Sequence, residues 1–427
     1  MKRKIGIGVL ILLCLGIGVF TYNKLQNHKY VFTNTQALDK LKSGSLSMML
    51  ETEVNSGTYQ QSNEVTWPSE GYVFNESLSK CENGGELSWD ESNKKVVLES
   101  NKSDKCYVYF DVEVPVSLET VCTAGEYLQS CVKNFASNGT EKTNIYIHDS
   151  SLTNGAKDNS YRYSGASEEV NNFVCFGSDA TTCPTDNLYR MIGVFGRQVK
   201  LVKYDYATSS VLGTNGDYYT TASMGYSSTY KGVLTQKSTY YWNYKNNTST
   251  NSGNGSNTWS TSLLNKTNLN TNYLNNIGST WSNMIENTIW KVGGNTQANI
   301  RKVVPGTSYQ NEITSPAAST TYSAKIGLLY FSDYGFAAAP SAWSTTLSNY
   351  DSSSVKLVNW MFMGAPEFLI TPLTDNLYAV GEIDSAGHIF SATGSSMSLV
   401  RPVFSLKAEV MYNGGNGTIS SPVRLSI

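Results

Sequence analysis

Charged side chains are scarce in this chain. Only 15% of its 427 residues are Asp, Glu, Lys or Arg, whereas an average soluble domain has about 25%. The 32 basic and 34 acidic residues give a formal net charge of −2, so a basic surface that could bind phosphates is not expected and nucleic acid is excluded as a partner. The polar surface must come from Asn, Ser, Thr, Gly and Tyr, of which Tyr alone numbers 28.

Motifs that would indicate common enzymes are also missing. The three histidines, His28, His148 and His388, lie far apart and form no HxxxH pair, which argues against a catalytic zinc site. The sequence has no Walker loop, no Rossmann fingerprint and no Gly-x-Ser-x-Gly elbow. Composition and motifs therefore narrow the function without naming an activity.

Residues 1–30 are predicted to form a cytoplasmic tip and a transmembrane anchor. An apolar run from Ile5 to Tyr22 follows the basic residues at positions 2–4. As a helix this run would be about 27 Å long, close to the roughly 30 Å hydrocarbon core of a bilayer. The basic cluster favours a cytoplasmic N-terminus with the bulk of the chain outside. A cleaved signal peptide is the alternative, but no small-residue cleavage site follows the run before Ala37.

Seven cysteines are present, and none follows residue 183. Apart from Cys14, which lies in the apolar run, they form three closely spaced couples. The couples predict three disulfides: Cys81–Cys106, Cys122–Cys131 and Cys175–Cys183. An even number of cysteines outside the anchor is typical of an oxidising, extracellular compartment. Metal binding is the alternative, but no CxxC pair is present.

Residues 31–70 are predicted to be a membrane-proximal stalk, and residues 71–118 a small β-module. Apolar and polar residues alternate in Cys106–Val114, which is typical of a strand with one buried face. Glu86–Trp89 and Lys95–Glu99 are its predicted neighbours. A module this small needs a covalent staple, which the first disulfide would supply.

Residues 119–427 are predicted to form a larger α+β unit. Leu188–Phe195 and Gln198–Tyr204 are the strands of a predicted hairpin, because Gly196-Arg197 suits a two-residue turn. Periodicity predicts further elements. The helices are Ala124–Phe135 and a segment with Trp281, Met284, Ile285 and Ile289 on one face; the strands are Ile326–Phe331, Phe368–Thr371, Leu377–Gly381 and Val400–Leu406. The polar, low-complexity residues 245–258 are expected to be an exposed loop.

An ordered series of short motifs runs through residues 170–427. It comprises YRMI (189–192), YWN (241–243), SLLN (262–265), YLN (273–275), IGLLYFSDYG (326–335), NWM (359–361), FLITP (368–372) and SLVRPVFSL (398–406). In this order the motifs resemble the formylglycine-generating-enzyme-like and C-type-lectin-like superfamily, and more closely a set of bacterial surface domains with that fold. The small module around LSW (87–89) is similar to one that accompanies such domains on anchored bacterial proteins.

The resemblance implies a compact α+β fold with a twisted, irregular sheet and long loops. The family's catalytic branch binds copper through a cysteine pair, but no cysteine follows Cys183. Its sugar-binding branch uses a calcium site marked by Glu-Pro-Asn and Trp-Asn-Asp strings, and neither occurs here. The resemblance therefore implies a binding scaffold, with no cofactor expected, and leaves the ligand open.

Segment 360–397 is where such folds display ligand-facing loops, so the resemblance places the candidate binding site there. The candidate ligand-binding residues are Trp360, Glu367, Asp375, Asn376 and His388. Aromatic faces stack on sugar rings, while amides and carboxylates bond to hydroxyls. The alternatives are core packing for Trp360 and solvated turns for the acids.

Two further roles are assigned in and beside this segment. A calcium site is an alternative use of four polar residues, Asp375, Asn376, Glu382 and Asp384, although no twelve-residue calcium loop is present. Arg401 stands on an otherwise apolar strand, and a buried Arg needs partners. It is therefore predicted to form a structural salt bridge or carbonyl clamp rather than to bind an anion.

Together these observations predict a single-pass cell-membrane protein whose bulk is extracellular. Its function is predicted to be recognition or adhesion, with the C-terminal loops binding a glycan or a host or neighbouring surface protein. The alternatives are an envelope enzyme on the same fold with non-copper chemistry, and a structural cell-surface subunit.

Overall fold

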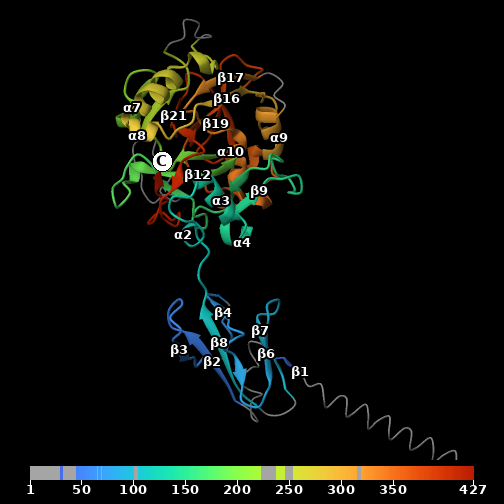
Figure 1. The fold of residues 1–427 in the computed structure, drawn as a ribbon. Helices are drawn as coiled ribbons and strands as arrows, with labels where there is room; N and C mark the ends of the chain where they lie inside the picture. Colours follow the sequence, from blue (N-terminus) through green and yellow to red (C-terminus); the bar gives the residue numbers. More distant parts are fainter. Residues whose placement is uncertain are drawn as a thin grey trace, which may run out of the picture. The chain divides into compact units, whose positions relative to one another are not determined.

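The computed structural model describes residues 29–31, 45–64, 66–68, 70–100, 104–222, 237–245, 253–314 and 319–427. The chain divides into two compact units, Met1–Pro115 and Val116–Ile427 (Figure 1). The apolar run predicted as a membrane anchor, residues 5–22, lies outside the described residues. Within the described part of the chain, no helix is long and apolar enough to cross a membrane.

The small unit is built from two β-sheets. One has the strand order β3-β2-β8-β4, with β5 also paired to β8, and the other has the order β1-β7-β6. The strands are β1 (Lys29–Val31), β2 (Ser45–Glu51), β3 (Tyr59–Gln61), β4 (Tyr72–Phe74), β5 (Lys80–Cys81), β6 (Glu86–Asp90), β7 (Lys95–Glu99) and β8 (Lys105–Val112). The three strands predicted for this module are confirmed as β6, β7 and β8, but β6 and β7 are not neighbours of β8 as predicted, because they pair in the other sheet while β8 pairs with β2, β4 and β5.

Strand β2 lies inside residues 31–70, which were predicted to be a stalk, and it corrects that prediction. It pairs in parallel with β8, from Ser45 opposite Lys105 to Leu50 opposite Phe110. Three consecutive apolar residues at positions 48–50 hide the alternation that would have marked a strand. The sheet of the small unit therefore begins well before residue 71.

One face of β8 forms the core of the small unit. Its alternate residues Cys106, Val108 and Phe110 are each at most 1% exposed, as the period of two predicts. Trp89 packs edge-on against Phe110, with ring centroids 5.5 Å apart. The predicted disulfide between Cys81 and Cys106 is confirmed and joins β5 to β8.

The large unit is a mixed α+β fold, as predicted. Its main sheet has the order β22-β13-β12-β10-β9, with β11 also paired to β12, and the smaller sheets are β14-β15-β21, β16-β17, β18-β19-β20 and β23-β24. The strands are β9 (Ile145–Ile147), β10 (Tyr161–Tyr163), β11 (Phe173–Cys175), β12 (Leu188–Phe195), β13 (Gln198–Lys203), β14 (Tyr218–Ala222), β15 (Lys237–Tyr241), β16 (Thr288–Gly293), β17 (Ser319–Ala324), β18 (Glu367–Pro372), β19 (Ala379–Ile383), β20 (Ile389–Thr393), β21 (Met397–Ser398), β22 (Val403–Ser405), β23 (Met411–Tyr412) and β24 (Leu425–Ser426).

The helices of the large unit are short. The α-helices are α2 (Leu118–Val121), α3 (Leu128–Ala136), α4 (Thr140–Thr143), α5 (Ser209–Leu212), α7 (Leu274–Asn276), α8 (Ser279–Ser282), α9 (Pro305–Tyr309), α10 (Phe331–Ala337) and α11 (Ser353–Lys356). The other helical segments are η1 (Thr185–Asn187), η2 (Trp259–Thr261), η3 (Leu264–Tyr273), η4 (Gln310–Thr314), η5 (Pro340–Ala342) and η6 (Leu347–Asn349), of which η3 and η4 are π-helical.

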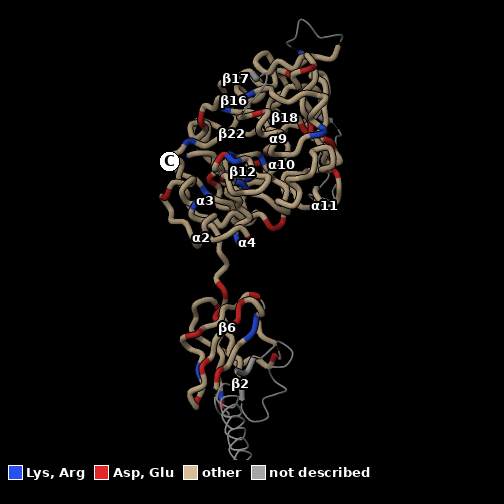
Figure 2. The backbone as a smooth tube through the Cα atoms, turned by 90° about the vertical axis from the view of Figure 1, so that its right-hand side faces the viewer, with Lys and Arg blue, Asp and Glu red and all other residues tan. Residues whose placement is uncertain are grey.

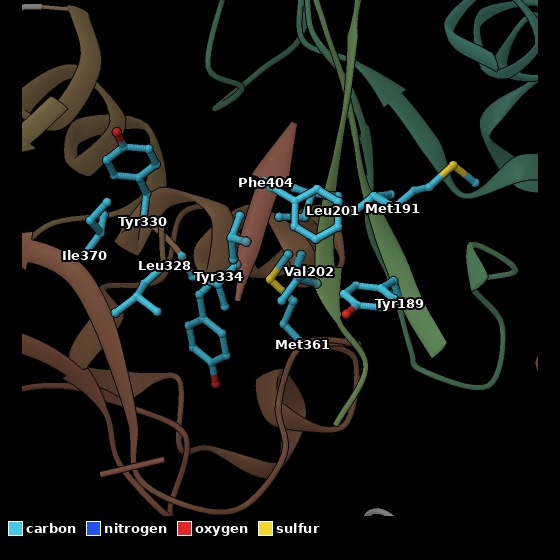
Figure 3. Packing of buried hydrophobic residues seen from close by; sticks show 14 of the residues in the cluster. Tyr189, Met191, Leu201, Val202, Leu328, Tyr330, Tyr334, Met361, Ile370 and Phe404 are labelled. Atoms are coloured by element: carbon cyan, nitrogen blue, oxygen red, sulfur yellow. The ribbon is translucent and has the colours of Figure 1, made fainter. Parts of the chain in front are cut away.

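The predicted hairpin is confirmed as β12 and β13, and its strands supply the core of the large unit. Phe195 pairs with Gln198 across the turn, where Gly196 has a φ of +63°. Leu201 of β13 lies opposite Phe404 of β22, and Figure 3 shows these two side chains close together within the cluster of buried residues. The other two predicted disulfides, Cys122–Cys131 and Cys175–Cys183, are also confirmed.

Two predicted elements are wrong. The helix predicted to carry Trp281, Met284, Ile285 and Ile289 on one face does not form over this whole segment. It is replaced by the short helix α8 and then by β16, on which Ile289 is 69% exposed. Pairing with β17 along its full length overrides the helical spacing. Ile326–Phe331 is not a ladder strand, because its β-pairing among the described residues is limited to an isolated bridge from Gly327 to Val403 before α10 begins.

Asparagines in and near η3 bind this chain's own backbone. The Asn268 side-chain amide donates to the carbonyls of Leu212 and Asn215 at 2.8 and 2.9 Å. Asn265 and Asn270 donate to other carbonyls in the same way. The Asn-rich composition therefore serves internal bracing in this region, which weakens its value as evidence for a sugar-binding surface.

Candidate functional site

Trp360, the first residue of the predicted binding loops, lies in the core. Its side chain is 1% exposed, and its Nε1–H donates to the Tyr163 carbonyl oxygen at 2.9 Å. The Arg190 guanidinium lies 4.6 Å from the centroid of its ring. In this structure the indole has no surface to offer a ligand, so the structural position corrects the expectation of an exposed stacking residue.

Glu367 is also buried, because it pairs with Arg401. Arg401 donates from Nε to both Glu367 carboxylate oxygens at 2.9 and 3.0 Å, and from Nη2 to the Met361 carbonyl at 2.9 Å. Burial raises the pKa of Glu367, and the neighbouring guanidinium opposes the shift. The predicted salt bridge and carbonyl clamp of Arg401 are confirmed, and Glu367 is their structural partner rather than a ligand-binding residue.

Asp375 and Asn376 lie in the loop between β18 and β19 and bind another loop of the same chain. Asp375 accepts the backbone N–H groups of Gln297 and Ala298 at 2.6 and 3.3 Å. The Asn376 amide donates to the Gln297 side-chain oxygen at 3.0 Å. Asp384 follows the other end of β19, so the four residues suggested as calcium ligands do not converge on one site.

His388 and Asp384 form a close pair in the turn between β19 and β20. His388 Nδ1 lies 2.9 Å from Asp384 Oδ2, and Asp384 Oδ1 accepts three backbone N–H groups of this turn. Nearby, the Ser398 hydroxyl donates to the Glu382 carboxylate, and burial raises the pKa of Glu382 to about 7. The serine hydroxyl is thus directed to a carboxylate, and the arrangement is not that of a nucleophile activated by an imidazole.

A pocket of about 200 Å³ lies elsewhere, between the main sheet, β16, α9 and α10. Four aromatic rings and two isoleucines form its apolar walls: Phe195, Trp290, Tyr309, Tyr330, Ile289 and Ile313. Its charged lining comprises three cations, Arg162, Lys200 and Lys291, and one carboxylate, Asp333. In a chain with so few charges this is an unusual concentration, and Figure 2 shows basic and acidic segments near one another around β12 while most of the backbone is uncharged.

The register of the main sheet places two of the cations side by side. Arg162 of β10 and Lys200 of β13 are both register partners of Gly193 on β12. Ser405 of β22 is the partner of Lys200 on its other side. Residues in register on neighbouring strands point to the same face, so this row forms the floor of the pocket. A Cβ at Gly193 would lie 2.0 Å from the Tyr161 carbonyl oxygen, which is why glycine occupies the middle of the row.

Lys200 is enclosed by aromatic rings and paired with Asp333. Its Nζ donates to Asp333 Oδ2 at 2.5 Å and lies 4.8 Å from the ring centroid of Tyr330 and 5.7 Å from that of Trp290. Asp333 also accepts the Tyr330 backbone N–H at 3.1 Å, which caps α10. Burial lowers the pKa of Lys200, and Asp333 opposes the shift.

Arg162 has a carboxylate partner of its own. Its Nη2 lies 2.8 Å from Asp158 Oδ2, and its Nη1 lies 3.9 Å from Asp333 Oδ1. The guanidinium stacks among Phe195, Tyr309 and one further ring, with centroid distances of 4.7 and 5.1 Å to the first two. The floor therefore holds two paired cations fixed by ring contacts.

A second buried carboxylate, Glu312, lies beside the pocket next to the pocket-lining residue Ile313. Glu312 on η4 is fully buried and accepts the N–H groups of Phe331 and Ser332 at 3.0 and 3.2 Å and the Thr371 hydroxyl at 2.8 Å. Burial raises the pKa of Glu312 to about 7, and these hydrogen bonds limit the rise. Glu312 thus orients the first turn of α10, which presents Asp333 to the pocket.

The rim differs from the floor in exposure. Ile289 is 69% exposed, and Lys291 is half-buried and donates from Nζ to the Ile313 carbonyl. Gln198, two residues before Lys200 on β13, also lines the pocket. Among the described residues, the Lys291 ammonium forms no ion pair with a carboxylate.

Sequence reasoning missed this pocket. Its charged residues come from four separate elements, β10, β13, β16 and α10, and they are brought together by the register of the main sheet and by the tertiary packing of β16 and α10. The available signal was the alternation of Gln198 and Lys200 with the apolar Val199 and Leu201. In an isolated strand that polar face indicates exposure to solvent, whereas here both faces of β13 are covered.

No protein-family model, curated protein or solved structure matches this chain.

Proposed function

We propose that the chain is a membrane-anchored extracellular recognition protein whose large unit is a lectin-like binding scaffold. The pocket carries this proposal, because aromatic walls, fixed cations and one carboxylate converge there in an otherwise weakly charged chain. Such a combination of apolar lining with few fixed polar groups is typical of small-molecule sites. The binding site is therefore assigned to the pocket rather than to the loops of segment 360–397.

Compartment and anchoring are part of the same proposal. The three disulfides support an oxidising environment outside the cytoplasm. The apolar run at residues 5–22, with basic residues before it, supports a single membrane pass with the N-terminus inside. Because the chain has few charges, it suits recognition through aromatic stacking and neutral hydrogen bonds. The charged side chains that take part in binding are those that line the pocket.

A binding screen tests the proposal. The full chain, purified in mild detergent, is applied to glycan arrays and to panels of cell-surface proteins. Saturable binding to a glycan or a surface protein is expected, and Lys200→Met is expected to weaken it. Failure of the folded chain to bind any member of either set would overturn the proposal.

A further inference from the structure

Only two of the three cations that line the pocket are paired with a carboxylate among the described residues. Lys200 is matched by Asp333 and Arg162 by Asp158. Lys291 has only the Ile313 carbonyl as its hydrogen-bond acceptor among the described residues. An anionic group beside Lys291 would therefore find an uncompensated, half-buried ammonium, where charge-assisted hydrogen bonds are stronger than at an open surface.

The floor fixes the orientation of such a ligand. Each cation of the floor is already paired with a carboxylate, Lys200 with Asp333 and Arg162 with Asp158, so a ligand carboxylate would find a cation left unpaired by the described residues at Lys291 on the rim. The Asp333 carboxylate and the Ser405 hydroxyl on the floor are suited to hydrogen bonding with ligand hydroxyls. The Gln198 amide, two residues before Lys200 on the same strand, lines the pocket and can serve in the same way. The ligand is thus expected to carry hydroxyls at one end and an anion at the other.

The walls and the volume limit the body of the ligand. Rings of Phe195 and Tyr309 and the side chain of Ile289 offer apolar surfaces on which the C–H face of a sugar ring can pack. A volume of about 200 Å³ is below the range of roughly 300–1,000 Å³ found for drug-sized ligands. The space suits one ring rather than an extended chain.

We infer that the pocket binds a sugar acid, a single hydroxylated ring that carries a carboxylate, either free or as the terminal residue of an acidic polysaccharide. This inference rests on the proposed function and specifies the ligand class of the same site. Lys291 is the residue that distinguishes the acid from the neutral sugar, while Asp333, Ser405 and Gln198 bind hydroxyls common to both.

Calorimetric titration of the full chain in mild detergent tests the inference with two matched probes. D-Glucuronate and D-glucose differ only in the carboxylate, so glucuronate is expected to bind at least about tenfold more tightly. Lys291→Gln keeps the backbone N–H that donates to the Tyr330 hydroxyl and removes the charge. It is expected to weaken glucuronate binding about tenfold and to leave glucose binding unchanged. A glucuronate-terminated oligosaccharide in the same titration distinguishes a polysaccharide end from the free sugar.

Lys302→Gln is the matched control, because Lys302 is exposed and does not line the pocket. Equal binding of the two sugars, or no effect of Lys291→Gln in a variant that melts like the native chain, would overturn the sugar acid and leave the proposed recognition function standing. Absence of binding by glucuronate and its oligosaccharide, in a chain that still binds a target in the screen, would also overturn it. A chain that binds neither the sugars nor any screened target would overturn both proposals.

Discussion

Two buried ion pairs in the large unit share the same chemistry and differ in their surroundings. Arg401 and Glu367 are each 2% exposed and bind each other, and Arg401 also donates to the Met361 carbonyl. Lys200 and Asp333 are almost as buried, at 7% and 3%, and border a pocket of about 200 Å³. Charge and burial are therefore alike in the two pairs, and the pocket beside Lys200 and Asp333 is the added observation that makes this pair a candidate for ligand binding.

The first prediction breaks the pair of Arg401 and Glu367. Glu367→Ala would leave Arg401 as a buried charge without its carboxylate, and such losses cost about 3–5 kcal/mol of unfolding free energy. Urea unfolding of the full chain, followed by tryptophan fluorescence, measures the change in the transition of the large unit. The double variant Glu367→Leu/Arg401→Met is the control and should recover most of the loss, since no uncompensated charge remains. A loss below about 1 kcal/mol for Glu367→Ala would contradict the structural role.

The second prediction concerns the buried carboxyl group beside the pocket. Burial raises the pKa of Glu312 to about 7, above its ordinary value of 4.5, so the folded chain holds a proton that the unfolded chain releases between these values. The stabilisation from this proton is present at low pH and is lost as the pH rises from about 5 to about 8. The full effect is on the order of 3 kcal/mol.

Unfolding free energies measured across this pH range test the effect, and Glu312→Gln should remove its share of the slope. Glu382, whose pKa burial also raises to about 7, should supply a slope that remains in this variant and disappears in Glu382→Gln. An unchanged slope in Glu312→Gln would contradict the assignment of a proton to Glu312.

The third prediction breaks the pair that borders the pocket. Lys200→Met leaves Asp333 with the Tyr330 N–H at 3.1 Å and Arg162 at 3.9 Å, so the loss of unfolding free energy should be only about 1–2 kcal/mol. Binding of the target found in the screen should nevertheless fall about tenfold or more. Equal and large destabilisation in Lys200→Met and Glu367→Ala would remove the contrast between the two pairs.

Local sequence signals predicted the parts of the fold that depend on local chemistry. The hairpin of β12 and β13 followed from a glycine-first turn, and the three disulfides followed from the close spacing of the cysteines. Strand β8 was predicted from the alternation of apolar and polar residues in Cys106–Val114. These features are specified by a few neighbouring residues, so no knowledge of the tertiary structure was needed.

The site could not be predicted in the same way. Arg162, Lys200, Lys291 and Asp333 meet only because the main sheet sets its register and α10 packs at the pocket. Residue type alone also failed for Trp360, because an indole can fill a core as readily as it can stack on a sugar. The wrong helix around Ile289 has the same origin, since pairing with β17 outweighed the spacing of apolar residues.

The most direct test of the central claim compares two exposed aliphatic residues. Ile289, 69% exposed, lines the pocket mouth, and Leu377, 75% exposed, lies in the β18–β19 loop beside Asp375 and Asn376. Replacing each by Trp adds bulk at the surface without disturbing the core. Affinity for the target found in the screen, measured on both variants of the full chain, should fall for Ile289→Trp and stay at the native value for Leu377→Trp. The opposite result would place recognition in the C-terminal loops and contradict the assignment to the pocket.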